Sequence, residues 1–349
     1  MSLELLVAGA MVVSLNFYAL LGGADYGGGV WDLFANGPRY KQQRALIAHA
    51  IGPIWEANHV WLILVIVVLF TAFPIGFATI ATALHIPLTL LLIGIVLRGS
   101  AFTFRTYDSQ RDSVQRRWGR LFSIASIITP LMLGLIVGAI ASDQIRLDAT
   151  SFEVTFIRPW LSPFAFAVGF FAISLFAFLA AVYLTLETND RELQDDFRRR
   201  ALVSGVAVGA FALIVFVLSG NYASEIRAGI TASPWAIPLH IATAICALGA
   251  FITLWRRSYR LARLFAAGQV SLILWGWALA QYPYIVGPTV TIYSGGAPRE
   301  TQQLLVIALC GGALILFPSF YYLFRVFKGR TLLTDRAQQS QPSDLSQPE

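Results

Sequence analysis

The stretch WEANHVWLILVIVVLFTAF, residues 55–73, decides the fold class of this chain. Beyond His59 it is apolar apart from Thr71, and as a helix it is about long enough to cross a ~30 Å hydrocarbon layer. Apolar runs of similar length recur along the chain, separated by charged loops. The sequence therefore predicts an all-α polytopic membrane protein with nine transmembrane helices. The nine predicted spans are 4–24, 55–73, 76–97, 121–141, 162–186, 201–219, 236–254, 264–281 and 303–325.

Composition agrees with this class. Hydrophobic residues make up 57% of the 349 residues and charged residues 13%, about half the charged share of a soluble domain. The short turn Phe73-Pro74-Ile75-Gly76 predicts a tight helical hairpin between the second and third spans. For the whole set we expect two four-helix bundles plus one extra helix.

Basic residues predict the orientation of the chain in the membrane. With a cytoplasmic C-terminus, 21 of the 25 Lys and Arg residues fall in inner segments, as the positive-inside rule requires. Nine spans then place the N-terminus outside. We expect residues 1–333 to form a single transmembrane domain and residues 334–349, rich in Gln, Ser and Pro, to form a disordered cytoplasmic tail. The net charge of +6 suits contact with anionic lipid and needs no nucleic acid as a partner.

A polar cluster interrupts the first three spans. Asp25 is expected at the end of the first span, Glu56 at the start of the second and Arg98 at the end of the third, so the predicted topology brings all three to the cytoplasmic face. Glu56 and His59 are three residues apart on one helix face, and Trp55 precedes His59 by four. Ionisable groups at membrane depth are costly and often mark an ion or proton path. A proton relay through Glu56 and a structural ion pair with Arg98 both remain open from the residues alone.

Glycines near this cluster and histidines in other spans resemble possible binding sites. The glycines 22, 23, 27, 28 and 29 lack the pattern of a phosphate loop, and we expect them to allow close helix approach or an irregular backbone. His85 is predicted near mid-membrane and His240 near the outer end of its span, which disfavours haem ligation by the pair. We expect histidine hydrogen bonds between helices, and neither a cofactor-binding nor a metal-binding residue in this chain.

The residues of the cluster resemble subunit II of the cytochrome bd-type quinol oxidases. The resemblance extends over the nine-span layout up to the tail. It is strongest in GADYG (23–27), in GPIWEANHVWLI (52–63) and from Leu97-Arg98 to Phe104-Arg105. Two positions depart from the family pattern: Glu56 stands where Asp is frequent, and His59 stands where Gln or Glu is frequent.

This resemblance implies a partner role in the bacterial inner membrane. The family's subunit I carries the haems, haem b with or without haem d, and the quinol site, while subunit II is haem-free. The complex oxidises quinol, reduces oxygen to water with cytoplasmic protons and is electrogenic. The resemblance assigns proton admission to Glu56 and matches Asp25 to a second acidic position of the family. Trp55 and Trp61 belong to the family motif, and Trp61 matches a tryptophan beside a proposed oxygen route. We expect Asp25 to take part in proton entry, with His59 and Arg98 in support. Small accessory subunits occur as further partners, and this chain would hold no catalytic centre of its own.

Two other functions are compatible with buried acids. A proton-coupled secondary transporter would use them for coupling, but the cluster lies at one membrane face and no repeated half is apparent. A purely structural membrane subunit would use them as ion pairs. Variants of Glu56 separate the structural reading from proton admission.

Overall fold

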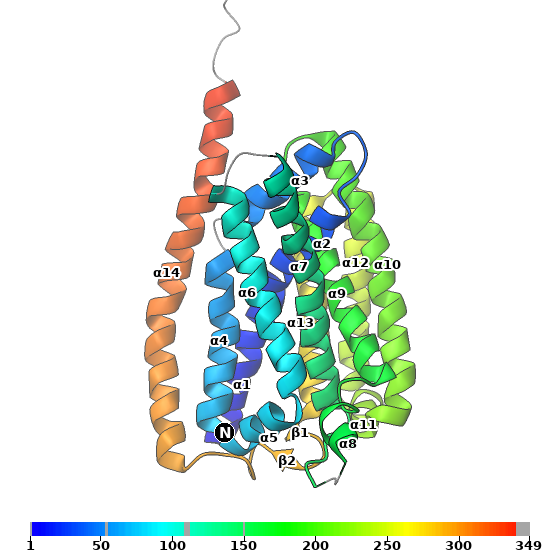
Figure 1. Cartoon of the computed structure of the whole chain (residues 1–349), viewed down its shortest axis with the longest axis vertical. Coiled ribbons are helices and arrows are strands. Elements are labelled where there is room, and N and C mark those ends of the chain that lie inside the picture. Colours follow the sequence, from blue (N-terminus) through cyan, green and yellow to red (C-terminus); the bar gives the residue numbers. More distant parts are fainter. Residues whose placement is uncertain (1, 53–54, 108–111, 149–150, 340–349) are drawn as a thin grey trace, which may run out of the picture. The chain divides into compact units, whose positions relative to one another are not determined.

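The computed structural model describes residues 2–52, 55–107, 112–148 and 151–339 of the chain. In this part of the chain, nine helices are long and apolar enough to cross a membrane. Figure 1 shows the long helices of residues 1–297 running side by side. The predicted fold class, an all-helical polytopic membrane protein, is confirmed.

The elements follow the predicted order with additional short helices. The first half contains α1 (Leu3–Phe17), the π-helical turn η1 (Tyr18–Gly22), α2 (Gly23–Leu33), α3 (Tyr40–Ile51), α4 (Trp55–Ala72), α5 (Pro74–Ala83), α6 (His85–Tyr107) and α7 (Asp112–Ala141). The second half contains α8 (Phe152–Phe156), α9 (Pro163–Leu184), α10 (Arg191–Tyr222), α11 (Ser224–Ala232), α12 (Ala236–Trp255), α13 (Tyr259–Gln281) and α14 (Arg299–Gln339). Between α13 and α14, the short strands β1 (Tyr284–Val286) and β2 (Val290–Thr291) pair antiparallel.

The chain forms two compact units, residues 1–297 and residues 298–349. The helix of the second unit among the described residues is α14, which contains the ninth of the long apolar segments. Residues 334–339 of the predicted tail continue this helix, and residues 340–349 lie outside the described residues. The predicted domain boundary at residue 333 and the orientation in the membrane remain predictions.

The first span is longer than predicted, because α1, η1 and α2 form one continuous helix from Leu3 to Leu33. Asp25 therefore lies inside a helix and not at its end. Arg98 likewise lies inside α6, which continues to Tyr107. The glycines 27–29 also lie inside α2, since a glycine costs a helix only about 1 kcal/mol and tight packing can offset that cost.

The predicted hairpin between the second and third spans is wrong. Pro74 begins a separate short helix, α5, and α6 begins only at His85. A proline fits the first turn of a helix because its missing N–H would have no partner there. Pro87, in the first turn of α6, was the overlooked sign of this second start. The third span is consequently shifted toward the C-terminus by about nine residues relative to the predicted start at residue 76.

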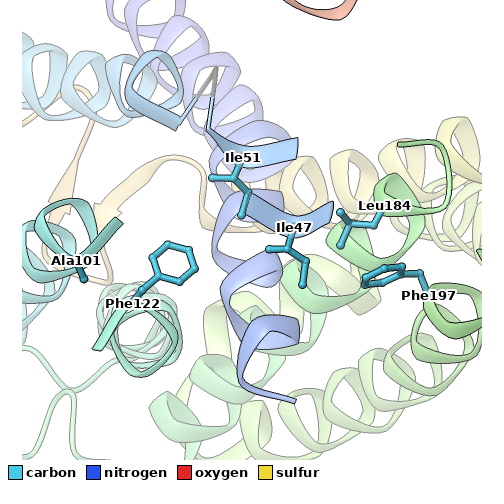
Figure 2. Close-up of a cluster of buried hydrophobic side chains, with 6 residues drawn as sticks. All are labelled: Ile47, Ile51, Ala101, Phe122, Leu184 and Phe197. Atoms are coloured by element: carbon cyan, nitrogen blue, oxygen red, sulfur yellow. The ribbon is translucent and has the colours of Figure 1, made fainter. Parts of the chain in front are cut away.

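Helix α3 was also not predicted, and it organises the core beside the polar cluster. Figure 2 shows Ile47 and Ile51 of α3 lying between side chains of the neighbouring helices. The buried cluster consists of Ile47, Ile51, Ala101, Phe122, Leu184 and Phe197. Trp31 and Trp55 pack against its edge. Apolar side chains from five helices thus enclose one end of the region that contains Asp25 and Arg98.

Candidate functional site

Asp25 is a buried carboxylate on α2, with 4% of its surface exposed. Asn58 of α4 is fully buried, and its Nδ2 donates a hydrogen bond of 2.5 Å to Asp25 Oδ2. Burying a carboxylate is costly unless hydrogen bonds or opposite charges compensate. This bond therefore joins the first span to α4 at a group whose charge has to be balanced inside the protein. Asn58 was not among the predicted site residues.

Arg98 of α6 is the buried cation of the cluster, with 2% of its surface exposed. Its guanidinium carbon lies 4.7 Å from the ring centre of Tyr26 and 5.2 Å from that of Phe122. Its Nε donates to Ser126 Oγ at 3.2 Å, while Nη2 has no hydrogen-bond partner among the described residues. Aromatic faces stabilise a desolvated guanidinium by cation–π attraction. The aromatic rings of Tyr26 and Phe122 are therefore the main contacts of the Arg98 guanidinium.

Glu56 does not join the buried cluster in the described chain, because it lies on the exposed face of α4. Residues two apart on a helix point about 200° apart, so the burial of Asn58 turns Glu56 outward. Arg98 lies over Tyr26, the residue that follows Asp25, so Asp25 and Arg98 share one region, and Glu56 lies on the exposed face of α4. The cytoplasmic position of these residues stays a prediction.

His59 connects α4 to two buried tyrosines. Its Nδ1 lies 3.1 Å from the carbonyl oxygen of Trp55, and its Nε2 lies 3.4 Å from the hydroxyl of Tyr26. Tyr18 donates from its own hydroxyl to that of Tyr26 at 3.1 Å. These contacts form a hydrogen-bonded chain across η1, α2 and α4. Sequence reasoning found His59 but missed both tyrosines.

The two predicted tryptophans have different surroundings. Trp55 lies edge-on to His59, with 6.2 Å between ring centres, and packs beside Phe102 at 5.9 Å. Trp61 is buried, with 4% of its surface exposed, and stacks on Phe17 at 4.5 Å. Trp55 therefore borders the polar cluster, whereas Trp61 belongs to the apolar contact between α1 and α4.

A second buried carboxylate, Asp32, was not predicted as a site residue. It is 1% exposed and accepts hydrogen bonds from Ser123 Oγ at 2.8 Å and Arg105 Nη1 at 3.2 Å. Arg44 Nε lies 4.0 Å from the same carboxylate. Asp32 follows Asp25 by seven residues, a spacing that puts both on one face of α2. That spacing was the signal that could have found it.

An ionic network fixes the segment that leads from α2 to α3. Arg39 contacts both Glu192 and Asp196 of α10 at 2.8 Å. The hydrogen bond to Asp196 is the main reason why the pKa of the Arg39 guanidinium lies above its usual value. Gln43 Nε2 also donates to Asp196 at 2.8 Å, and Arg200 donates to Gln43. The network attaches the start of α3 to α10.

The remaining histidines differ from their predicted depths or partners. His85 opens α6 and does not lie near the middle of a span; its Nδ1 lies 2.9 Å from Thr82 O. His240 lies in the first turns of α12, with Nδ1 2.6 Å from Ala236 O. The expected bond between helices is instead made by His59. Among the described residues, no group of three or more His, Cys, Asp or Glu side chains could hold a metal ion.

The fold and the cluster define a multi-pass helical membrane protein with ionisable groups buried between its spans. The chain belongs to the cytochrome bd terminal oxidase subunit II family, whose family model matches residues 3–327. A chain of a solved bd oxidase from Geobacillus thermodenitrificans has the same fold, with a TM-score of 0.78 at 20% identity. The match covers 94% of this chain and 99% of that chain.

Curated relatives agree with the family. A Bacillus subtilis protein provisionally named cytochrome bd menaquinol oxidase subunit II is 25% identical over 93% of this chain and 96% of its own length. Subunit 2 of the cytochrome bd-I ubiquinol oxidase of Escherichia coli is 25% identical over 62% of this chain and 55% of its own. Family membership implies an oxidoreductase complex with haem and a partner subunit I. The protein is a multi-pass protein of the bacterial cell membrane.

Proposed function

We propose that this chain is the haem-free subunit II of a cytochrome bd-type quinol oxidase and that it admits cytoplasmic protons to oxygen reduction in subunit I. The observation that carries the proposal is the Asp25 carboxylate, 4% exposed within a span and hydrogen-bonded to the fully buried Asn58. Such a group is costly at membrane depth and by default marks an ion or proton path or a partner contact. Subunit I would hold haem b, with or without haem d, and quinol and oxygen would be substrates of the complex.

The chemistry of the complex requires a proton supply. Reducing one oxygen molecule to two water molecules consumes four electrons and four protons, and quinol oxidation releases its protons where the quinol binds. If quinol reacts near the outer face and the consumed protons come from the cytoplasm, turnover is electrogenic. Glu56, exposed at the start of α4, would collect protons, and Asp25 would pass them inward.

The other predicted site residues would act in support. Arg98 lies over Tyr26 and provides a positive charge in the buried region. His59 and Trp55 form the hydrogen-bonded face of α4 beside it. Trp61, buried against Phe17, would border the apolar route that the family resemblance assigns to oxygen.

One observation favours a second candidate, a purely structural subunit. Glu56 is exposed in this chain, so a partner's basic group could cover it in the complex and fix the interface. In that case the carboxyl would serve binding and would not move protons. Substitution by an amide separates the two functions, because glutamine keeps the size of the side chain but has neither a proton to transfer nor the negative charge of an ion pair. Loss of the proton lowers turnover, whereas loss of the charge weakens the interface.

The test uses Glu56→Gln and Asp25→Asn in the complete complex. Both variants should retain the haem spectrum of the wild-type complex and lower its oxygen-consumption rate by roughly 10-fold or more, within the range of a lost proton-transfer group. Glu225→Gln is a matched control, because Glu225 is also an exposed acid in the first turn of a helix. Wild-type turnover in both variants would refute proton admission, and loss of assembly in Glu56→Gln would favour the structural subunit.

A further inference from the structure

Tyr18 and Tyr26 are buried tyrosines that the proposed proton path does not use. Tyr18 is 1% exposed and Tyr26 is 0% exposed. Buried hydroxyls need hydrogen-bond partners. The hydroxyl oxygens of Tyr18 and Tyr26 lie 3.1 Å apart, and His59 Nε2 lies 3.4 Å from the Tyr26 hydroxyl. The three side chains come from η1, α2 and α4, so tertiary packing is required to bring them together.

The Trp55 carbonyl oxygen determines which atom donates in each of these hydrogen bonds. The Trp55 carbonyl oxygen can only accept, so His59 Nδ1 carries the hydrogen in that 3.1 Å contact. In a neutral imidazole Nε2 is then the acceptor, and Tyr26 donates to it while accepting from Tyr18. The lone pair of Nε2 therefore faces the two hydroxyls.

The π-turn in the first span brings the two tyrosines onto one face of the helix. Tyr18 and Tyr26 are eight residues apart, which in a regular α-helix leaves them about 80° apart around the axis. The π-turn from Tyr18 to Gly22 inserts about one extra residue. The spacing then approaches two complete turns, which puts both tyrosines on one face. A Cβ on Gly22 would lie 2.9 Å from Tyr18 Cε2, so glycine also leaves room for the ring.

We propose that His59, Tyr26 and Tyr18 form a proton relay from the start of α4 to the middle of the first span. The proposal rests on the proposed function, since its protons are those that the exposed Glu56 collects. Tyr18 is the central residue of the 31-residue helix 3–33. The relay thus extends from the exposed face beside Glu56 to about half the length of that helix.

Each transfer balances without an ionised tyrosine. Tyr18 first turns its O–H away from Tyr26, and Tyr26 turns its own O–H from His59 toward the Tyr18 oxygen. Nε2 of His59 then accepts a proton from Glu56 or water. The Nε2–H bond then breaks as an O–H bond forms on Tyr26, while Tyr26 passes its original proton to the Tyr18 oxygen. Tyr18 releases its own original proton to an acceptor on its inner side, a water molecule or a carboxylate of the partner subunit, where an O–H bond forms as the Tyr18 O–H bond breaks. One proton is taken up, one is released, and all three groups are neutral again.

The variants Tyr26→Phe and Tyr18→Phe test the relay, because each removes a hydroxyl and keeps the ring that packs in the core. Tyr183→Phe is a matched control, since that tyrosine lies on α9 under Arg263 and outside the chain of hydrogen bonds. Oxygen consumption by the complete complex is measured in H₂O and in D₂O, and the haem spectrum reports assembly. Both variants should lower turnover by roughly 10-fold and change the solvent isotope effect, and the double variant should be no slower than Tyr26→Phe alone.

Glu56→Gln and Asp25→Asn, measured alongside, separate the relay from the proposed function. If the acid variants are slow and both tyrosine variants match Tyr183→Phe, the relay is wrong and the proposed function stands. If all four match the control, both fail. If only the tyrosine variants are slow, the relay stands with His59 as its own intake and the acids lose their role. If a tyrosine variant does not assemble, the variant His59→Ala tests the relay instead. Added imidazole should restore the turnover of His59→Ala if the relay operates. Turnover that imidazole does not restore would overturn the relay.

Discussion

Arg98 shows at the scale of one residue how the chain keeps a charge inside its spans. The guanidinium is 2% exposed, lies over Tyr26 and Phe122, and donates to Ser126. A planar guanidinium can stack on rings and donate in its own plane at the same time, which a lysine ammonium cannot. The position therefore selects arginine for its shape as much as for its charge.

Replacing Arg98 by lysine should lower stability measurably. The stacking on two buried rings is worth about 2 kcal/mol when desolvated, and the shorter ammonium loses it together with the bond to Ser126. Thermal unfolding of the complete complex in detergent checks this. Arg263→Lys is the matched control, because Arg263 lies 4.9 Å from the Tyr183 ring but is itself exposed. Arg263→Lys should lower the free energy of unfolding by about 0.5–1 kcal/mol. Equal losses of stability in Arg98→Lys and Arg263→Lys would contradict the stacking argument.

Helix α2 shows at the scale of an element why its glycines are needed. A Cβ on Gly27 would lie within contact of the Phe176 backbone oxygen of α9, and one on Gly29 would overlap Ser126 of α7. Small residues let helix backbones approach closely in membrane proteins. The expectation that these glycines permit close helix approach is therefore confirmed, and the irregular backbone that was the other expectation occurs at η1.

Gly27→Ala should prevent α2 and α9 from packing, because the Cβ would meet backbone and not a flexible side chain. We expect little assembled complex and a clear loss of thermal stability in what remains. Gly9→Ala is the control, since no atom lies within 4 Å of its added Cβ. That change should be neutral or stabilise by about 0.5–1 kcal/mol. Normal assembly and stability of Gly27→Ala would show that the two helices are not in close contact.

Asp32→Asn tests how much the ion pair between Asp32 of α2 and Arg105 of α6 stabilises the protein. Breaking a buried pair leaves an uncompensated charge and typically costs about 3–5 kcal/mol, here mainly at Arg105. Asp195→Asn, which breaks the more exposed pair with Arg257, should cost about 0–1 kcal/mol. Unfolding temperatures of the two variants give the comparison. A loss for Asp32→Asn as small as that for Asp195→Asn would mean that water screens the Asp32 carboxylate.

Hydropathy and charge in the sequence were sufficient for the number of apolar spans among the described residues and for the region that holds Asp25 and Arg98. They were insufficient for the angular position of individual residues: Glu56 faces outward because Asn58 faces inward. The Tyr18–Tyr26 alignment depends on a π-turn that has no hydropathy signature. Helix α5 was missed because an apolar helix too short to span looks like part of the next span. Composition therefore predicts well where a residue lies along its helix and predicts poorly which way its side chain faces around the helix axis.

At the scale of the whole molecule, the chain combines an extensive apolar surface with a small polar interior. Large hydrophobic side chains are exposed along α4, α6, α10, α12 and α14, as expected for helices that face lipid or a partner subunit. The polar interior is concentrated between α2, α4, α6 and α7, around Asp25, Arg98 and Asp32. This division suits a subunit that conducts protons toward chemistry performed in another chain.

The most direct test of that claim is proton uptake during a single reaction of the fully reduced complex with oxygen, followed with a pH-sensitive dye. Wild type and Glu225→Gln should take up protons from the medium at the same rate. We predict that Asp25→Asn, with an unchanged haem spectrum, takes them up roughly 10-fold more slowly or worse. Uptake in Asp25→Asn at the rate of the wild type and of Glu225→Gln would contradict proton admission through this subunit.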